Sequence, residues 1–267
     1  MKTLSIRFGW LGLVGILLLG QGVPAFAEWY IGGYGGYNLP QSLRYVTMNN
    51  YGYQSAVTRY GFSQSDLILG NQLTQDFKTS NLDLKASPIY GAKAGYFFND
   101  QGFSWLGVET EIFTTDPQIK QQKVATDQQI TFVTGVPIPA PPCTLPLNHT
   151  CSYQEHLKGT LNVAKSSLRV ITFAFNVVAR YPGKILQPYA SVGVGGFYFM
   201  GSNMFNGSQF TPGLNASVGA KWLVTPEWGL FVEGKYNLAG ISTLDSTFGL
   251  SGTYSIFHAV GGLAYHF

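Results

Sequence analysis

The sequence predicts an all-β fold, an eight-stranded antiparallel transmembrane β-barrel, and three observations lead to this prediction. Charged residues make up only 11% of the 267-residue chain and aromatic residues 15%, with 33 glycines, whereas a typical soluble domain is about 25% charged. The mean hydropathy of +0.09 is too low for a bundle of membrane-spanning helices. Segments of about ten residues with alternating polarity recur along the chain, which is the pattern of strands that face lipid on one side only.

Residues 1–27 have the features of a secretory signal peptide. Lys2 and Arg7 precede an uncharged apolar run, and Ala25-Phe26-Ala27 forms a small-residue cleavage motif. The apolar run is shorter than the roughly 20 residues that a membrane-spanning helix needs. We therefore expect secretion, with Glu28 as the first residue of the mature chain.

The remaining chain, residues 28–267, is predicted to form one barrel domain. Its connections differ sharply in length, because some are tight turns, whereas 39–87 and 116–166 each contain about 50 residues. Short turns on one rim and long loops on the other are typical of outer-membrane barrels. We therefore expect short periplasmic turns, with both termini on that side, and two long extracellular loops. Eight strand segments are predicted, at 28–38, 88–98, 104–115, 167–181, 188–201, 210–224, 228–239 and 253–267.

The alternation assigns an apolar face and a polar face to each strand. In the segment 167–181, every second residue from Ile171 to Tyr181 is apolar, and the residues between them include Asn176 and Arg180. The apolar faces carry almost no charge, whereas the outward face of a soluble sheet would be polar. We therefore expect the apolar faces to contact lipid and the polar faces to line the lumen. The aromatic residues near strand ends that are expected to form interfacial belts are Tyr96, Tyr181, Tyr198, Trp222, Trp228 and Tyr236.

The C-terminal segment carries the most specific pattern. Its alternating apolar residues end with Leu263, Tyr265 and a C-terminal Phe267. Two further segments, Trp29-Tyr30-Ile31-Gly32-Gly33 and Gly91-Ala92-Lys93-Ala94-Gly95-Tyr96-Phe97, share its character. With these residues the sequence resembles the small outer-membrane β-barrel family that includes the transmembrane domain of outer-membrane protein A and the opacity porins.

The resemblance implies a location in the outer membrane of a Gram-negative-type bacterium, where the lipid bilayer and lipopolysaccharide surround the barrel. It also implies that Leu263, Tyr265 and Phe267 form the signal read by the barrel-assembly machinery, with periplasmic chaperones as further partners during biogenesis. The resemblance is specific for architecture and weak for activity. It leaves the extracellular ligand and the oligomeric state open.

Seven charged residues fall on the faces assigned to the lumen. A barrel of eight strands leaves room inside for side chains but for little continuous water. An unpaired charge buried there would be very costly, so we expect a network of ion pairs that fills the lumen. A charged lining of a narrow pore is the alternative, and the sequence leaves the individual pairs undetermined. The predicted network contains Lys93, Glu109, Glu111, Arg180, Lys221, Glu233 and Lys235.

The two cysteines, Cys143 and Cys151, lie in the long connection 116–166. Secretion makes a disulfide between them the expected state, with free thiols as the alternative. A metal site that adds His149 and His156 is a further alternative. Its spacing lacks the close cysteine pair typical of zinc sites, so no metal and no cofactor is predicted.

Known enzyme motifs are missing from the sequence. It contains no G-x-S-x-G and no H-E-x-x-H, and the histidines of the last strand, His258 and His266, have no serine in a His-x-Ser arrangement. Removal of Lys2 and Arg7 lowers the formal net charge from +3 to +1, which gives no support for nucleic-acid binding. We therefore expect a protein that is neither an enzyme nor a nucleic-acid binder.

The expected function is that of a membrane-embedded scaffold with surface-exposed loops available for interaction. The main alternative is a narrow porin or small-molecule channel that resembles the outer-membrane protein W group, although the lumen charges oppose it. An adhesin is the third possibility, because 39–87 is rich in residue types that suit recognition surfaces, and a plain polar loop is the simpler interpretation. Residues 129–134 could extend a strand above the membrane. The inward-facing aromatic residues that favour a channel are Trp105, Phe197, Phe199 and Phe231.

Overall fold

The computed structural model describes residues 28–60, 72–133 and 152–267. In these ranges the chain is mostly β-structure, with fourteen strands joined in one sheet and a single α-helix, so the all-β prediction is confirmed. The expected signal peptide and both cysteines lie outside the described residues. None of the helices in the described ranges is long and apolar enough to cross a membrane.

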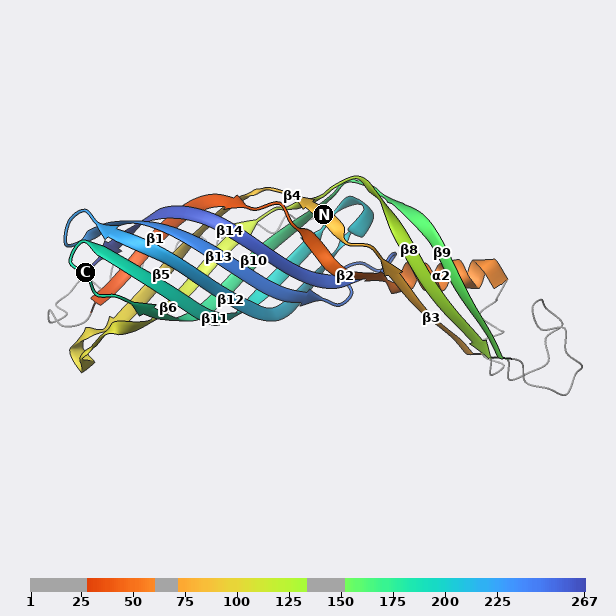
Figure 1. Ribbon diagram of the computed structural model, residues 1–267, viewed down its shortest axis with the longest axis horizontal. Helices are drawn as coiled ribbons and strands as arrows, with labels where there is room; N and C mark the ends of the chain where they lie inside the picture. Colours follow the sequence, from red (N-terminus) through yellow and green to blue (C-terminus); the bar gives the residue numbers. More distant parts are fainter. Residues whose placement is uncertain (1–27, 61–71, 134–151) are drawn as a thin grey trace, which may run out of the picture.

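Eight of the strands pair in a closed antiparallel ring, which appears as a tilted barrel in Figure 1. Their bounds lie within three residues of the eight predicted segments. Phe267 and the first residues of the ring meet beside the tight turns, where the Trp29 N–H donates to the Phe267 carbonyl oxygen at 3.3 Å; we call this the turn end. The ring consists of β1 (Glu28–Asn38), β5 (Pro88–Phe98), β6 (Phe103–Thr115), β10 (Ser166–Arg180), β11 (Leu186–Gly201), β12 (Gly207–Leu223), β13 (Trp228–Ile241) and β14 (Leu250–His266).

The strands of the ring are staggered, and the stagger can be followed from one paired residue to the next. From Tyr30 of β1, directly paired residues lead around the ring to Ile256 of β14. The residue of β14 that pairs with Tyr30 is His266, ten positions further on. A closed ring with such an offset must tilt its strands against the barrel axis. Inward side chains at one height therefore come from different positions along their strands.

The barrel wall alternates as the sequence predicts, and β10 shows this most clearly because its residues are alternately buried and exposed. Asn176 is fully buried, whereas its neighbours Phe175 and Val177 are exposed on the outside. The period of two therefore fixes which face is apolar. One inward assignment is wrong, because Trp105 is 48% exposed. It lies near a register shift in the pairing of β5 with β6, and such irregularities interrupt the alternation.

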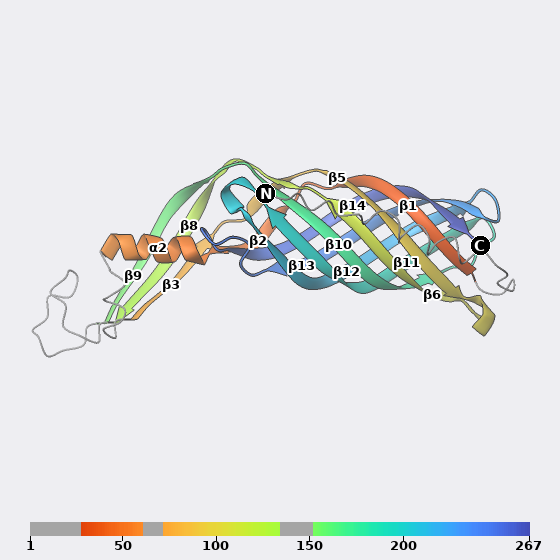
Figure 2. The same ribbon diagram turned by 180° about the vertical axis from the view of Figure 1, so that it is seen from behind.

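The described parts of the two connections predicted as long loops are folded, which corrects the expectation of eight strands joined by loops. They contribute α2 (Asn49–Tyr60) and six strands that belong to the same sheet as the barrel. β3 (Gln72–Thr79), β8 (Gln122–Val133), β9 (Ser152–Val163) and α2 form what we call the arm. It extends from the end of the barrel opposite the turn end (Figures 1 and 2). The short strands between barrel and arm, which we call the collar, are β2 (Ser42–Met48), β4 (Leu82–Lys85) and β7 (Gln118–Ile119).

A continuous apolar cluster closes the ring at the arm end; we call it the apolar cap. Inside the ring, Phe199 lies against Tyr254 with 5.2 Å between ring centroids. The collar adds Val46 and Met48 of β2, and the same cluster continues to Phe77 in the arm. Burial of this many large side chains stabilises the junction, since each contributes about 1.5–3 kcal/mol. The cap therefore seals the lumen and joins the arm to the barrel.

Gly36 lies where β1 closes the ring against β14, and the backbones approach closely there. A Cβ atom at Gly36 would lie 2.1 Å from the carbonyl oxygen of Ala259, whereas a Cβ at Gly33 on the same strand would meet nothing within 4 Å. Because the obstructing atom belongs to the backbone, it cannot move without opening the seam.

We predict that Gly36→Ala destabilises the refolded barrel by at least the 1–3 kcal/mol or so that overpacking usually costs, and that Gly33→Ala leaves it nearly unchanged. Urea unfolding in lipid vesicles, followed by the change in gel migration between folded and heated samples, measures the difference. Equal stability of the two variants would contradict the closed seam.

Candidate functional site

All seven charged residues predicted for the lumen lie inside the ring, and each is at most 6% exposed. They come from five strands, β5, β6, β10, β12 and β13. Glu109 and Glu111 are two positions apart on β6, as Glu233 and Lys235 are on β13, so each pair points to the same side of its strand. The structure arranges the seven residues in a central cluster and a second cluster near the turn end.

The central cluster contains two lysines and three glutamates. Lys93 Nζ lies 2.6 Å from Glu233 Oε2 and 3.4 Å from Glu109 Oε2. Lys235 Nζ lies 2.5 Å from Glu111 Oε1 and 3.0 Å from Glu233 Oε1. Glu233 therefore bridges both lysines. This joining of charges from three strands offsets the desolvation that an isolated buried ion would suffer.

Uncharged donors complete the central cluster, because three carboxylates face only two ammonium groups. Each carboxylate accepts a hydrogen bond of 2.6 Å from a tyrosine hydroxyl. Asn176 Nδ2 donates to Glu109 at 3.3 Å, and Asn215 Nδ2 donates to Glu111 at 3.1 Å. Hydrogen bonds to charged acceptors are the stronger ones. The tyrosine donors, in the order of Glu109, Glu111 and Glu233, are Tyr30, Tyr34 and Tyr189.

The second cluster lies at the turn end and includes a residue that sequence analysis did not assign to the lumen. Glu28 forms an ion pair with Arg180 and accepts a hydrogen bond of 2.5 Å from Arg180 Nη1. Glu28 Oε1 also lies 2.7 Å from His266 Nδ1, and Lys221 Nζ lies 3.1 Å from His266 Nε2. The alternation could have identified Glu28, because it is in phase with Tyr30 on β1.

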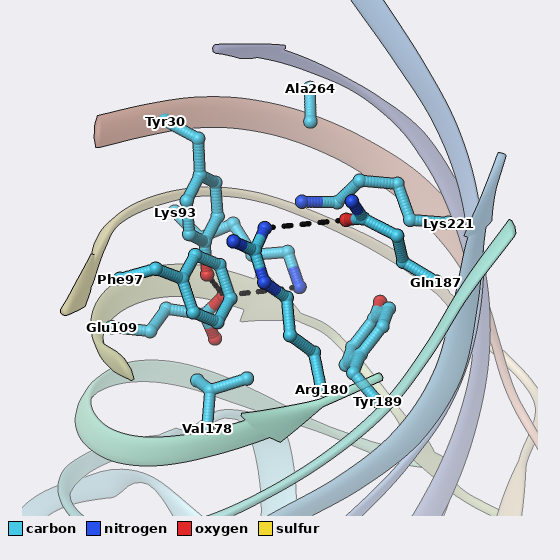
Figure 3. Close-up of a pocket in the computed structure, with 10 residues that line it drawn as sticks. All are labelled: Tyr30, Lys93, Phe97, Glu109, Val178, Arg180, Gln187, Tyr189, Lys221 and Ala264. Atoms are coloured by element: carbon cyan, nitrogen blue, oxygen red, sulfur yellow. Dashed lines mark hydrogen bonds and ion pairs between the residues drawn. The ribbon is translucent and has the colours of Figure 1, made fainter. Parts of the chain in front are cut away.

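The lumen is nearly filled at this level. A cavity of about 10 Å³ lies among the two clusters, which is about the space of one water molecule. Figure 3 shows Lys93, Arg180 and Lys221 extending toward this space from different strands. The Arg180 guanidinium lies 3.6 Å from the centre of the Phe97 ring, which adds a cation–π contact. The clusters therefore act as a packed plug.

A polar layer separates the central cluster from the apolar cap. His258 and Asn237 are buried there, and in the described part of the chain their side-chain nitrogen and oxygen atoms have no hydrogen-bond partner. The Phe113 ring packs edge-on against His258, with 6.2 Å between ring centroids. His258 and His266 thus occupy different layers of the lumen. Of these two histidines, only His266 forms an ion pair with an acidic side chain in the described part of the chain.

The described residues contain no group of three or more His, Cys, Asp or Glu side chains arranged to hold a metal ion. Of the four residues in the alternative metal site, His156 lies in the arm with its Nε2 atom 2.6 Å from Asp127 Oδ1. Cys143, His149 and Cys151 lie outside the described residues.

The aromatic residues predicted for the belts occupy the outside of the barrel. Tyr181, Trp222 and Trp228 are exposed near the turn end, and the Trp228 ring lies 5.0 Å from that of Tyr265. Toward the arm end, Tyr198 of β11 pairs with Phe210 of β12. Phe210 and other exposed aromatic residues belong to the same outward surface, although the predicted belts do not include them. The remaining predicted residues, Tyr96, Tyr236, Leu263 and Phe267, also lie on outward-facing positions.

A closed ring with an apolar outside, aromatic residues toward both ends and a charge-filled inside defines a membrane β-barrel protein. The family model described as outer membrane protein beta-barrel domain matches residues 16–267. The chain belongs to this family of outer-membrane proteins, which confirms the resemblance found in the sequence. No curated protein matches the chain at a significant level.

Several solved structures are similar to this chain at low sequence identity. Neisserial surface protein A is 11% identical with a TM-score of 0.42, and the match covers 90% of this chain and 99% of that protein. OprG from Pseudomonas aeruginosa is 16% identical with a TM-score of 0.39, and the match covers 92% of this chain and 98% of OprG. Ail, the attachment invasion locus protein of Yersinia pestis, was solved in complex with the heparin analogue sucrose octasulfate. It is 13% identical with a TM-score of 0.37, and the match covers 90% of this chain and 98% of Ail.

We predict that Glu233→Gln destabilises the barrel by about 3–5 kcal/mol, because both lysines of the central cluster would lose a carboxylate partner in a buried setting. The control is Glu227→Gln in the exposed turn before β13, which should change stability by no more than about 0.5 kcal/mol. Urea unfolding in vesicles checks both variants. A Glu233→Gln protein as stable as the parent would show that the cluster does not hold the lumen together.

Proposed function

We propose that this protein is a non-enzymatic integral barrel of the outer membrane of a Gram-negative-type bacterium. In this proposal the turn end faces the periplasm and the arm extends outside the cell. Family membership supports the location, and the separation of apolar outside from charged inside supports insertion in a bilayer. The arm is the element available for interaction, and the barrel is its membrane scaffold.

The filled lumen is the observation that carries the proposal. In the central cluster Glu233 lies 2.6 Å from Lys93 and 3.0 Å from Lys235. The apolar cap closes the lumen on the side of the arm. An ion crossing the lumen would have to displace both layers and would leave charges unpaired in a narrow interior. The arrangement therefore supports a scaffold rather than a pore.

The channel alternative receives less support from the placement of its aromatic residues. Phe197 and Phe199 belong to the apolar cap, with 6.3 Å between their ring centroids. The Phe231 ring lies 4.6 Å from Lys93 Nζ and packs with the central cluster. Because these rings contact buried neighbours, they fill the interior and do not line a route for an apolar molecule.

A folded arm supports a role in recognition, which includes adhesion. α2 is held to the arm sheet, since Gln128 Nε2 donates to the Gly52 carbonyl oxygen at 2.8 Å and Arg59 forms an ion pair of 2.8 Å with Glu155. The Tyr51 and Phe77 rings pack at 5.3 Å. A surface fixed in this way loses less conformational entropy on binding than a loose loop would.

We also propose that the outward residues at the end of β14, Leu263, Tyr265 and Phe267, are read by the barrel-assembly machinery while periplasmic chaperones deliver the chain. Leu263 and Phe267 are exposed, and the Tyr265 and Phe267 rings lie 6.0 Å apart. A row of apolar side chains on an outward face offers a contact that is available before the barrel closes.

We predict that the refolded protein is electrically silent in a planar bilayer, with a general porin as positive control. A variant in which short Gly-Ser linkers replace residues 50–77 and 126–159 should also be silent, because the charged clusters stay in place. Gel migration before and after heating verifies that both proteins are folded.

Steady conductance steps from the folded parent protein would contradict the proposal and favour the channel. Conductance from the arm-deleted variant alone would identify the arm as a gate, which would also favour the channel. If the parent protein mediates adhesion and the folded, silent, arm-deleted variant does not, recognition lies in the arm.

A further inference from the structure

The collar presents a cluster of cations on the outside of the barrel, at the junction with the arm where β4 lies in Figure 1. Lys85 of β4 pairs with Gln118 of β7, which pairs with Ser167 of β10. In the next row, the Lys120 N–H donates to the Asp83 carbonyl oxygen at 2.9 Å. Ser166 of β10 pairs with Ile119 of β7, so Lys165 and Lys120 are the next residues along the two chains. Neighbouring strands are about 4.8 Å apart, so these lysines lie close together.

This surface, which we call the cationic patch, consists of Lys85, Lys120, Lys165 and Arg169. Two carboxylates lie beside it, but only at long range, since Lys120 Nζ is 3.9 Å from Asp83 and Arg169 Nη2 is 3.7 Å from Asp116. Both pairs are exposed, and exposed pairs contribute little. In the described ranges Lys85 and Lys165 form no ion pair within 4 Å. The patch therefore keeps a net positive charge.

Directly beside the patch is the wall that faces lipid. Arg169 is two positions before Ile171 on the outward face of β10, which is about 7 Å along the strand. Ile171 pairs with Thr114, and Thr114 pairs with Tyr90, whose side chain is 62% exposed. Phe173 continues the apolar surface toward the turn end. Positive charge and lipid-facing surface thus follow one another within a few residues.

Four of the five cations around the collar lie in this sector of the rim. The fifth, the exposed Arg44 of β2, pairs with Thr253 of β14. The connections 202–206 and 242–249, which join the other strands at this end of the ring, contain no lysine or arginine. A cationic belt that served only to place the barrel at the bilayer surface would surround it evenly. The clustering on β4, β7 and β10 indicates a localised anionic ligand.

We propose that the cationic patch binds the phosphate groups of a multiply acylated glycolipid of the outer leaflet, the chemistry of lipid A. The inference rests on the proposed orientation with the arm outside the cell. The lysine ammonium groups would neutralise the phosphate charge, and the Arg169 guanidinium offers paired donors to phosphate oxygens. The acyl chains of the same molecule would lie along Tyr90, Ile171 and Phe173. One ligand thereby satisfies both the charged and the apolar surface.

The test compares two variants that each replace three exposed lysines by serine in the full chain. The patch variant is K85S/K120S/K165S, and the matched control on the outer face of the arm is K78S/K123S/K158S. Each protein is refolded in detergent, and its affinity for purified bis-phosphorylated lipid A and for dephosphorylated lipid A is measured by native mass spectrometry. Gel migration before and after heating verifies folding.

The parent and the arm control should bind bis-phosphorylated lipid A at least about tenfold more tightly than the dephosphorylated form, a difference of roughly 1.4 kcal/mol. The patch variant should lose this preference. An unchanged preference in the patch variant, or an equal loss in the arm control, would overturn the assignment. Equal competition by inorganic phosphate at the same phosphate concentration would also overturn it, because the ligand would then be a free anion.

Failure of this proposal can be distinguished from failure of the proposed function. The function is tested by bilayer conductance and by folding, neither of which depends on the three patch lysines. A folded, silent barrel without phosphate preference would therefore reject the lipid site alone.

Discussion

The need to neutralise charge inside a narrow ring governs the rest of this structure. Eight strands enclose an interior that side chains must fill, and here four cations and four carboxylates share it once Glu28 is included. Lys93 and Lys235 are shared among three carboxylates, and tyrosine hydroxyls supply the remaining donors. The strands are held together by this plug as well as by their backbone hydrogen bonds.

A plugged interior moves the surfaces available for binding to the outside and to one end. The longer strands of the ring reach the apolar cap, and the collar carries the same sheet onward into the arm. The arm is thereby joined to the barrel through one continuous sheet and one apolar cluster. The cationic patch lies on the collar, between the lipid-facing wall and the arm, so a bound glycolipid would touch the part of the molecule that orients the arm.

Strand alternation is a local property, and it therefore identified the eight segments of the ring and all seven lumen charges that the sequence analysis named. It could not identify the pairs. Glu233 meets Lys93, which lies 140 residues away, because the ring closes with a stagger of ten residues. The register between distant strands determines such a contact. The phase of Glu28 with Tyr30 on β1 also indicates an inward side chain, although Glu28 is the expected first residue of the mature chain and is not in the predicted network.

The sequence by itself determined the all-β class, the inward and outward faces and the charged character of the lumen, because each follows from a period of two along a single strand. The tertiary structure alone decided that 39–87 and 116–166 contain the collar and the arm. Their strands are short or polar on one face, and they acquire a buried side only when Met48, Phe77 and the top of the barrel meet in one cluster. Burial between segments distant in sequence leaves no periodic signal in any one of them.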